Sequence, residues 1–298
     1  MQGGLVMWKR WPGILIVSVL GASVFADYVA DREAAVKLQR AGKYQEALDA
    51  FLKMAGGEVT EVQKSDALHQ AAYCAYRLKD YDQAMKLAER IPIEGESKAT
   101  RLVLLNWMRK WKQAIAEFKS EDIAAWPDHV KYEAYRARGM SAYRIKDAEL
   151  AVADLSMAAK YANTNNDRSL ALCNLGDAYR VLLKDDEKAL EVYRRVLAGG
   201  HLYKGSRASL AIAGIQLKQG KPEEALAALE WVDMNKVNGP YRAYVLAARA
   251  NIFATMGKKT EAIEEYKKAL AVKGVPDYIR KNCEKALEKL EGGEEKKP

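Results

Sequence analysis

An alanine recurs along this chain at intervals of about 36 residues, and this internal repeat limits the possible fold more than any other feature. A turn residue or a charge precedes each alanine, and another apolar residue follows it by four positions, as in GKPEEALAAL (220–229). A fixed period of roughly 20–50 residues is the signature of a repeat architecture. The spacings are 37, 30, 37, 38, 36 and 37 residues, and the alanines are Ala47, Ala84, Ala114, Ala151, Ala189, Ala225 and Ala262.

A second apolar stretch precedes most of these segments, as in ALHQAAYCAYRL (67–78) and YVLAARANIFATM (244–256). Apolar residues recur there at i, i+3, i+4 and i+7, which is the helical period. Each unit is therefore predicted to be a helix, a tight turn ending in a left-handed residue, and a second helix. The turn glycines are Gly42, Gly220 and Gly257, and small residues expected at the helix crossings are Ala72, Gly139, Gly176, Ala213 and Ala250.

This pattern resembles the tetratricopeptide repeat, a helix–turn–helix unit of about 34 residues. The resemblance extends over about 28–275 and is closest in the fifth and seventh units. The third unit departs from the family, with Leu102 in place of the usual glycine and Arg109 at the turn. The fifth unit has one extra residue between its tyrosine and its alanine, and it is carried by Leu172, Leu175, Gly176, Tyr179, Ala189 and Tyr193.

The resemblance implies an all-α fold, an α-solenoid in which about seven helix pairs form a right-handed superhelix. A capping helix is expected from about Pro276 to Leu290, because its apolar residues share one face while the other is charged. The 30-residue step between Ala84 and Ala114 predicts a shortened connection around 91–98. The tail GGEEKKP (292–298) is too polar to fold and is predicted to be disordered.

The N-terminus is typical of a secretory signal peptide. Lys9 and Arg10 precede an uncharged run from Trp11 to Ala26 that ends in small residues. We therefore expect a signal peptide at 1–26, cleaved before Asp27, and a repeat domain at 27–291. An uncleaved anchor is the alternative, and it would be the chain's only attachment to a membrane. Both alternatives export the repeats, so the predicted location is the periplasm or the exterior.

The charge balance is mildly basic, with 48 Lys and Arg against 40 Asp and Glu. Removal of 1–26 would take away two basic residues and leave 46 against 40, a net charge of +6. These charges are spread along the chain, which is typical of solvated helix faces. Because an exported protein rarely meets nucleic acid, we expect no nucleic-acid partner. The oligomeric state is left open.

The sequence contains no known catalytic motif, such as HExxH, GxSxG or a phosphate-binding glycine-rich loop. The three histidines are scattered, and the three cysteines lie about 100 residues apart at positions that suit small apolar side chains. We therefore expect buried thiols, no metal site, no cofactor and no catalytic residue. The predicted protein is not an enzyme.

In the family that the chain resembles, the first helices of the pairs line a concave groove that binds ligand. The family's carboxylate clamp needs a Lys and an Asn four apart in a first helix, and no first helix here has that pair. The residues predicted to bind ligand are Tyr73, Tyr76, Arg136, Tyr143 and Arg180, with Arg136 or Arg180 holding a carboxylate. Further positions of the same stripe are Arg32, Val36, His69, Asn106, Met140, Asp177, Leu210, Leu217, Tyr244, Ala247 and Asn251.

The predicted function is that of a non-enzymatic scaffold in the cell envelope that binds a protein or an extended peptide through the groove. One alternative is a structural or self-assembling subunit of an envelope complex, which would use the ends or the convex face of the array. Another is an enzyme or a polysaccharide-binding module, and the lack of a hydrolytic motif argues against its enzymatic form. Measurement of the molecular mass at several concentrations separates the scaffold from the self-assembling subunit.

Overall fold

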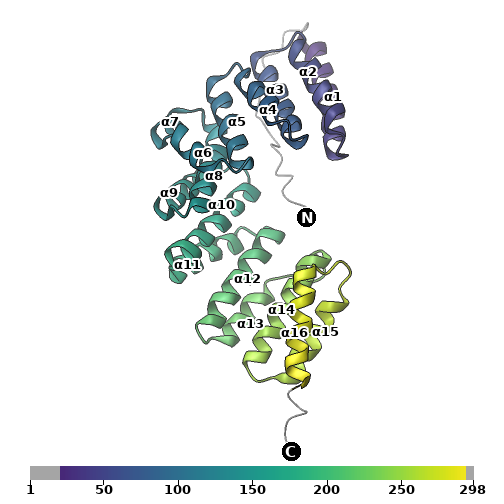
Figure 1. The fold of residues 1–298 in the computed structure, drawn as a ribbon, viewed down its shortest axis with the longest axis vertical. Coiled ribbons are helices and arrows are strands. Elements are labelled where there is room, and N and C mark those ends of the chain that lie inside the picture. Colours follow the sequence, from purple (N-terminus) through teal and green to yellow (C-terminus); the bar gives the residue numbers. More distant parts are fainter. Residues whose placement is uncertain (1–20, 293–298) are drawn as a thin grey trace, which may run out of the picture. The chain divides into compact units, whose positions relative to one another are not determined.

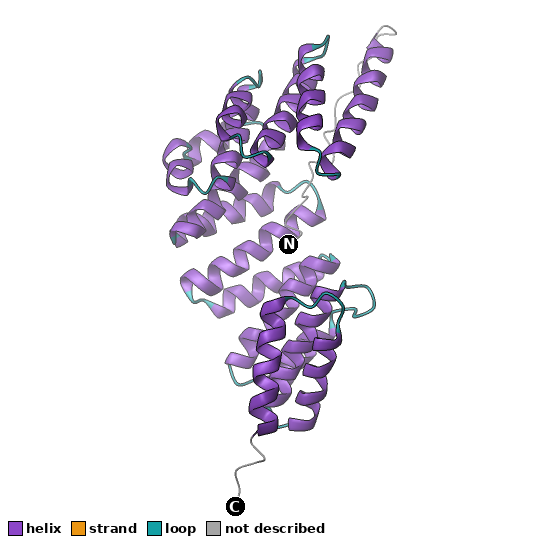
Figure 2. Cartoon of the chain, turned by 45° about the vertical axis from the view of Figure 1, so that its right-hand side comes forward, coloured by secondary structure: helices purple, strands orange, loops and turns teal. Residues whose placement is uncertain are grey.

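The computed structural model describes residues 21–292, which fold into α-helices and one π-helical turn, with no strand in that range (Figure 2). Two predictions fall largely outside the described residues: the basic start and most of the apolar run of the signal peptide, and the tail at 293–298. Helix α1 (Gly21–Arg40) is described from a point just before the predicted cleavage site. The all-α prediction is confirmed.

The chain divides into two compact units, with the boundary between Ile145 and Lys146. In the first unit, the first helices of the pairs contact one another in order, α1 with α3, α3 with α5, and α5 with α8. The helices of this unit are α1 (Gly21–Arg40), α2 (Tyr44–Gly56), α3 (Glu61–Arg77), α4 (Tyr81–Glu89), α5 (Glu94–Trp107), α6 (Trp111–Glu117), α7 (Ser120–Ala125) and α8 (Asp128–Ile145) (Figure 1).

The second unit repeats the same arrangement. Helices α10, α12, α14 and α16 contact one another in order, and the second helices α11, α13 and α15 each pack between two first helices. The elements of this unit are α9 (Ala148–Tyr161), α10 (Asn165–Ala178), the π-helical turn η1 (Tyr179–Leu183), α11 (Asp186–Ala198), α12 (Leu202–Lys218), α13 (Pro222–Glu230), α14 (Gly239–Thr255), α15 (Lys259–Ala271) and α16 (Asp277–Glu291).

The alanine register predicted from the repeat is confirmed, because all seven recurring alanines are fully buried. In chain order, the helices of residues 21–292 alternate as the first and second helices of seven repeats, followed by the capping helix α16. The short helix α7 is an addition to the third pair that the repeat did not predict. In α16, Ile279, Cys283 and Leu287 are buried against the last pair, as the apolar face predicted.

Each pair turns through one residue with a left-handed backbone. Gly42, Gly220 and Gly257 have φ values of 78°, 74° and 74°, as expected for glycines that end a first helix. The remaining four pairs place a charged residue at the same point. These residues are Lys79, Arg109, Lys146 and Lys184, with φ values of 67°, 61°, 66° and 58°.

The short step in the repeat has a different location from the one predicted. Helix α4 has only 9 residues, whereas α2 has 13, and α5 already begins at Glu94. Most of the segment 91–98 is therefore helical, and the connection after α4 has four residues, as many as the connection after α2. The missing length is in α4 and in α5, which has 14 residues where α3 has 17.

The extra residue of the fifth pair forms the π-helical turn η1. Gly176 precedes Ala189 by 13 residues, whereas the corresponding distance is 12 in the second, fourth, sixth and seventh pairs. The wider turn ends at Lys184, and the Asp185 amide donates a hydrogen bond to the Tyr179 carbonyl at 3.0 Å. A π-helical turn accommodates one added residue without ending the helix. Ala189 consequently stays at the buried position of α11.

Candidate functional site

Tyr73 and Tyr76 lie in an aromatic cluster of the first unit. Both are half-buried near the C-terminal end of α3, and both contact Trp107 of α5, with ring-centroid distances of 5.6 and 5.2 Å. The Tyr76 ring also lies 5.9 Å from that of Tyr81, which is 43% exposed. The structure therefore brings these two predicted residues together. Each ring packs against Trp107 and is in part exposed to solvent.

Polar contacts hold the same cluster. The Tyr76 hydroxyl donates a hydrogen bond to the Trp107 carbonyl at 3.2 Å, and burial raises the pKa of Tyr76. Arg77 donates to the Tyr73 hydroxyl at 2.6 Å and places its guanidinium 4.3 Å from the centroid of the Tyr44 ring. Such a cation–π contact contributes about 0.5–1 kcal/mol at an exposed site. The hydroxyls of Tyr73 and Tyr76 thus already serve the packing of α3.

Arg136 and Tyr143 lie on α8, and Arg136 has an acidic neighbour that the prediction did not count. Its guanidinium makes an ion pair with Glu133, one turn earlier on the same helix, and Nε donates to Glu133 Oε2 at 2.9 Å. Glu133 is buried, and the Arg136 side chain is only 17% exposed. The Arg136 guanidinium therefore already has a carboxylate partner within the protein. Tyr143 is half-buried near the end of α8.

Arg180 belongs to the second unit, where it lies in the π-helical turn beside Asp177. Its Nη2 is 3.5 Å from Asp177 Oδ1, and its side chain is 40% exposed. Asp177 also accepts hydrogen bonds from Arg207 of α12 and from the Tyr193 hydroxyl. Burial, followed by the Asp177 charge, raises the pKa of Tyr193, so the phenol stays a donor. One carboxylate thus serves two guanidinium groups, and this cluster carries a net positive charge.

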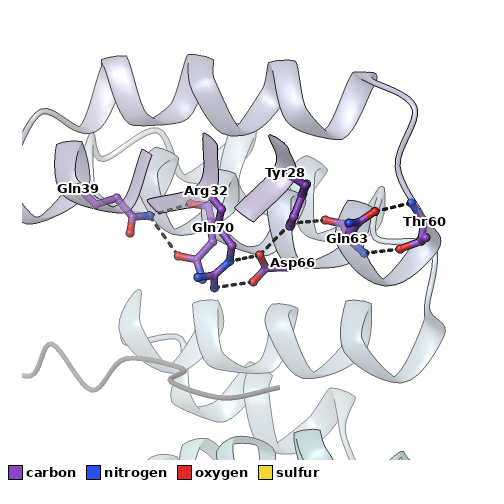
Figure 3. A network of polar contacts seen from close by, with 7 residues as sticks. All are labelled: Tyr28, Arg32, Gln39, Thr60, Gln63, Asp66 and Gln70. Atoms are coloured by element: carbon purple, nitrogen blue, oxygen red, sulfur yellow. Dashed lines mark hydrogen bonds and ion pairs between the residues drawn. The ribbon is translucent and has the colours of Figure 1, made fainter. Parts of the chain in front are cut away.

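The stripe residues of the first pair hold α1 on α3 through a polar network (Figure 3). Arg32 makes an ion pair with Asp66, with Nη2 3.0 Å from Oδ1. The Tyr28 hydroxyl lies 2.8 Å from the Gln63 carbonyl oxygen and 2.9 Å from Asp66 Oδ2. Arg32 therefore already has a partner on α3, and these contacts secure the start of the repeat domain.

Four tyrosines form a continuous row in the second unit that the sequence prediction largely missed. The rings of Tyr203, Tyr241, Tyr244 and Tyr278 follow one another with centroid distances of 5.4, 6.2 and 5.6 Å. Only Tyr244 was among the predicted stripe positions. The signal that could have identified the row is its spacing, because Tyr203, Tyr241 and Tyr278 are 38 and 37 residues apart, which is the repeat period.

The buried thiols are poor nucleophiles. Cys74, Cys173 and Cys283 are buried and unpaired, and burial raises the pKa of Cys74 and Cys173 to about 11. A thiol reacts through its thiolate, which is scarce at neutral pH for such values. Within residues 21–292, no group of His, Cys, Asp and Glu is arranged to hold a metal ion. None of the helices in that range is sufficiently long and apolar to cross a bilayer.

The arrangement defines an all-α helical-repeat solenoid. The family comparison agrees with this class: residues 178–287 match the family described as tetratrico peptide repeat, and residues 66–92 match one described as tetratricopeptide repeat. The chain is a tetratricopeptide repeat protein.

Solved structures of the same kind are similar to this chain at low sequence identity. A tetratricopeptide repeat protein from Parabacteroides merdae is 15% identical, with 88% of this chain and 98% of that chain covered and a TM-score of 0.49. A thermophilic TPR protein from Thermus thermophilus is 17% identical, with 87% and 98% covered and a TM-score of 0.29. A search of curated protein sequences finds no significant match.

Proposed function

We propose that this protein is a non-enzymatic scaffold of the cell envelope that binds a protein or an extended peptide through the first helices of its repeats. The observation that carries the proposal is the cluster of Asp177, Arg180 and Arg207. Two arginines share one carboxylate there, and Arg180 remains 40% exposed. A partly exposed guanidinium with an incompletely compensated charge is suited to a carboxylate on a partner, which it can bind through two parallel hydrogen bonds.

Capture from an envelope extract with the immobilised mature chain tests this function. The parent chain is expected to retain a protein partner, and Arg180→Glu is expected to weaken that binding by about 1–3 kcal/mol, the range for a hydrogen bond to a charged group. Arg194→Glu is the matched control, since Arg194 is exposed on the second helix α11 of the same unit. Equal binding by both variants and the parent would exclude the first-helix face.

Arg136 is a poorer test residue than the sequence indicated. A glutamate at this position would face the buried Glu133 at close range, and two adjacent carboxylates in a buried site destabilise the fold. Loss of binding by Arg136→Glu would therefore report on folding as well as on recognition. Arg180→Glu places a carboxylate near Asp177, but Asp177 is 22% exposed and keeps its ion pair with Arg207, so the cost to folding is smaller.

The envelope location depends on the signal peptide. When the full-length chain is expressed in a bacterium, the protein recovered outside the cytoplasm is expected to begin at Asp27. N-terminal sequencing measures this directly. An intact N-terminus on exported protein would replace the cleaved signal with an anchor, and retention in the cytoplasm would contradict the proposed location.

A further inference from the structure

We infer that the tyrosine row of the second unit, together with Arg207, is a binding site for an extended acidic peptide whose apolar side chains alternate with carboxylates. The inference rests on the proposed binding function and names the chemistry of the partner. The tyrosine row comprises Tyr203, Tyr241, Tyr244 and Tyr278.

The row crosses three successive first helices of the second unit. Tyr203 is near the start of α12, Tyr241 and Tyr244 are in the first two turns of α14, and Tyr278 is near the start of α16. These helices contact one another in order, as Figure 1 also shows for α12, α14 and α16. Tyr203, Tyr241 and Tyr244 are half-buried, and Tyr278 is 52% exposed. The row therefore forms a surface rather than part of the core.

The spacing of the rings fits an extended chain. Successive centroids are 5.4–6.2 Å apart, and two residues of an extended strand span about 6.6 Å. Every second side chain of such a peptide points to the same face. One apolar side chain can therefore meet each gap between neighbouring rings, while the intervening side chains point away from the tyrosines.

The tilt of the rings favours a peptide over a glycan. Neighbouring rings make angles of 51°, 61° and 44°, so no two neighbouring rings are coplanar. Rings in mutual contact at such angles leave notches between them and do not form one flat platform. Sugar rings bind best face to face on flat platforms, whereas small branched side chains fill notches.

The charge of this edge favours an acidic partner. The first turns of α12 and α14 contain no acidic residue, whereas the second helices α11 and α13 begin with Asp186, Glu187, Glu223 and Glu224. At the other end of the row, α16 has Asp277 in its first turn, so the positive part of the site is at α12 and α14. The N-terminal end of each helix carries a partial positive charge. The acids that commonly offset this charge are thus present on the second helices and absent from these two first helices.

Arg207 connects the row to the charged cluster beside the π-helical turn. Arg207 is four residues after Tyr203 on α12, and residues four apart are neighbours on one face of a helix. Arg207 shares Asp177 with Arg180. The positive end of the site is therefore near Tyr203 and Tyr241, and the row extends from there to Tyr278 on the capping helix.

Fluorescence anisotropy with defined probes tests the inference. The mature chain is titrated against a short labelled peptide that alternates leucine and glutamate. Two control peptides replace leucine by serine or glutamate by lysine, and chitohexaose competes as a neutral glycan. The leucine–glutamate peptide is expected to bind, and Tyr278→Ala combined with Tyr203→Ala is expected to raise its Kd about tenfold or more. Tyr81→Ala is the control, because Tyr81 is similarly exposed but lies in the first unit.

The outcomes separate the site from the proposed function. An unchanged Kd for the double variant, equal binding of the lysine or serine peptide, no binding of the leucine–glutamate peptide, or displacement by chitohexaose would each overturn the inference. If the double variant still captures the envelope partner as well as the parent does, the scaffold function stands and this site is wrong. If the parent captures no partner, the proposed function fails as well. The melting temperature of each variant shows that it is folded.

Discussion

The indole of Trp231 occupies the space that a side chain on Gly205 would need. A β-carbon on Gly205 of α12 would overlap the six-membered ring of the tryptophan, which follows α13. The two residues thus fix how closely the helices of the sixth pair approach each other. A glycine in the middle of a helix is otherwise unfavourable by about 0.5–1 kcal/mol relative to alanine, so close packing explains its presence here.

Gly205→Ala is accordingly expected to destabilise the protein by about 1–3 kcal/mol through overpacking. Gly214 provides a control in the same helix, because a β-carbon added there would have open space around it, with no neighbouring side chain within 4 Å. Gly214→Ala is expected to stabilise by about 0.5–1 kcal/mol through helix propensity. Urea unfolding measures both. If the two substitutions changed stability alike, the contact with Trp231 would not be the reason for the glycine.

The recurring alanines predict a second pair of effects. Ala189 of α11 and Ala225 of α13 are fully buried. Ala189→Leu and Ala225→Leu should each cost about 1–3 kcal/mol, because the added volume forces the helices apart. Ala227 is exposed on α13, and Ala227→Leu should leave stability within about 0.5 kcal/mol of the parent. Unchanged melting temperatures for the buried variants would contradict the register.

The charged residues in left-handed turns predict a stabilising change. Lys79 has a φ of 67°, a conformation that costs a residue with a β-carbon about 1–2 kcal/mol. Glycine removes this cost, but it also raises the conformational entropy of the unfolded chain, which offsets part of the gain in stability. We expect Lys79→Gly to stabilise by about 0.5–1 kcal/mol and Lys86→Gly, in the exposed middle of α4, to destabilise by about 1 kcal/mol. Thermal unfolding of the two variants would reveal any departure from these opposite signs.

His69 predicts a dependence of stability on pH. Burial lowers its pKa from 6.5 to about 4, while the Asp66 charge opposes this shift, and Nδ1 lies 2.9 Å from Thr100 Oγ1. The native state therefore keeps the imidazole neutral where the unfolded state binds a proton. The contribution of the neutral His69 to the free energy of unfolding is complete above the unfolded pKa of 6.5. It is lost as the pH falls toward the native pKa of about 4.

The free energy of unfolding should thus fall by about 1–3 kcal/mol more in the parent than in His69→Gln between pH 7 and pH 4. The comparison cancels the carboxylates that titrate in both proteins. Denaturant unfolding at several pH values measures it. Parallel pH profiles would show that His69 is accessible to protons in the native state.

The repeat could be read from the sequence because its signal is local and periodic. Each recurring alanine is identified by neighbours within one turn of helix, and the structure buries all seven. The pairing of Arg136 could also have been read, since Glu133 is three residues away on the same helix and such residues are neighbours.

Contacts between repeats were harder to predict. Arg207 and Asp177 are 30 residues apart, and their ion pair depends on how α12 packs against α10. The tyrosine row shows the same limit. Its period is visible in the sequence, but the contact between rings depends on side-chain rotamers that no spacing fixes. The location of the shortened step was mispredicted for a related reason, because a spacing gives the missing length but not the element that loses it.

The π-helical turn at Tyr179–Leu183 has a consequence for the chain that follows it. One residue added to an ideal α-helix rotates every later side chain by about 100° about the axis. The wider turn takes up that residue before α11 begins, so Ala189 remains buried and the later helices keep their faces. A change in length by a single residue therefore alters only this turn. The later helices still bury the same side chains.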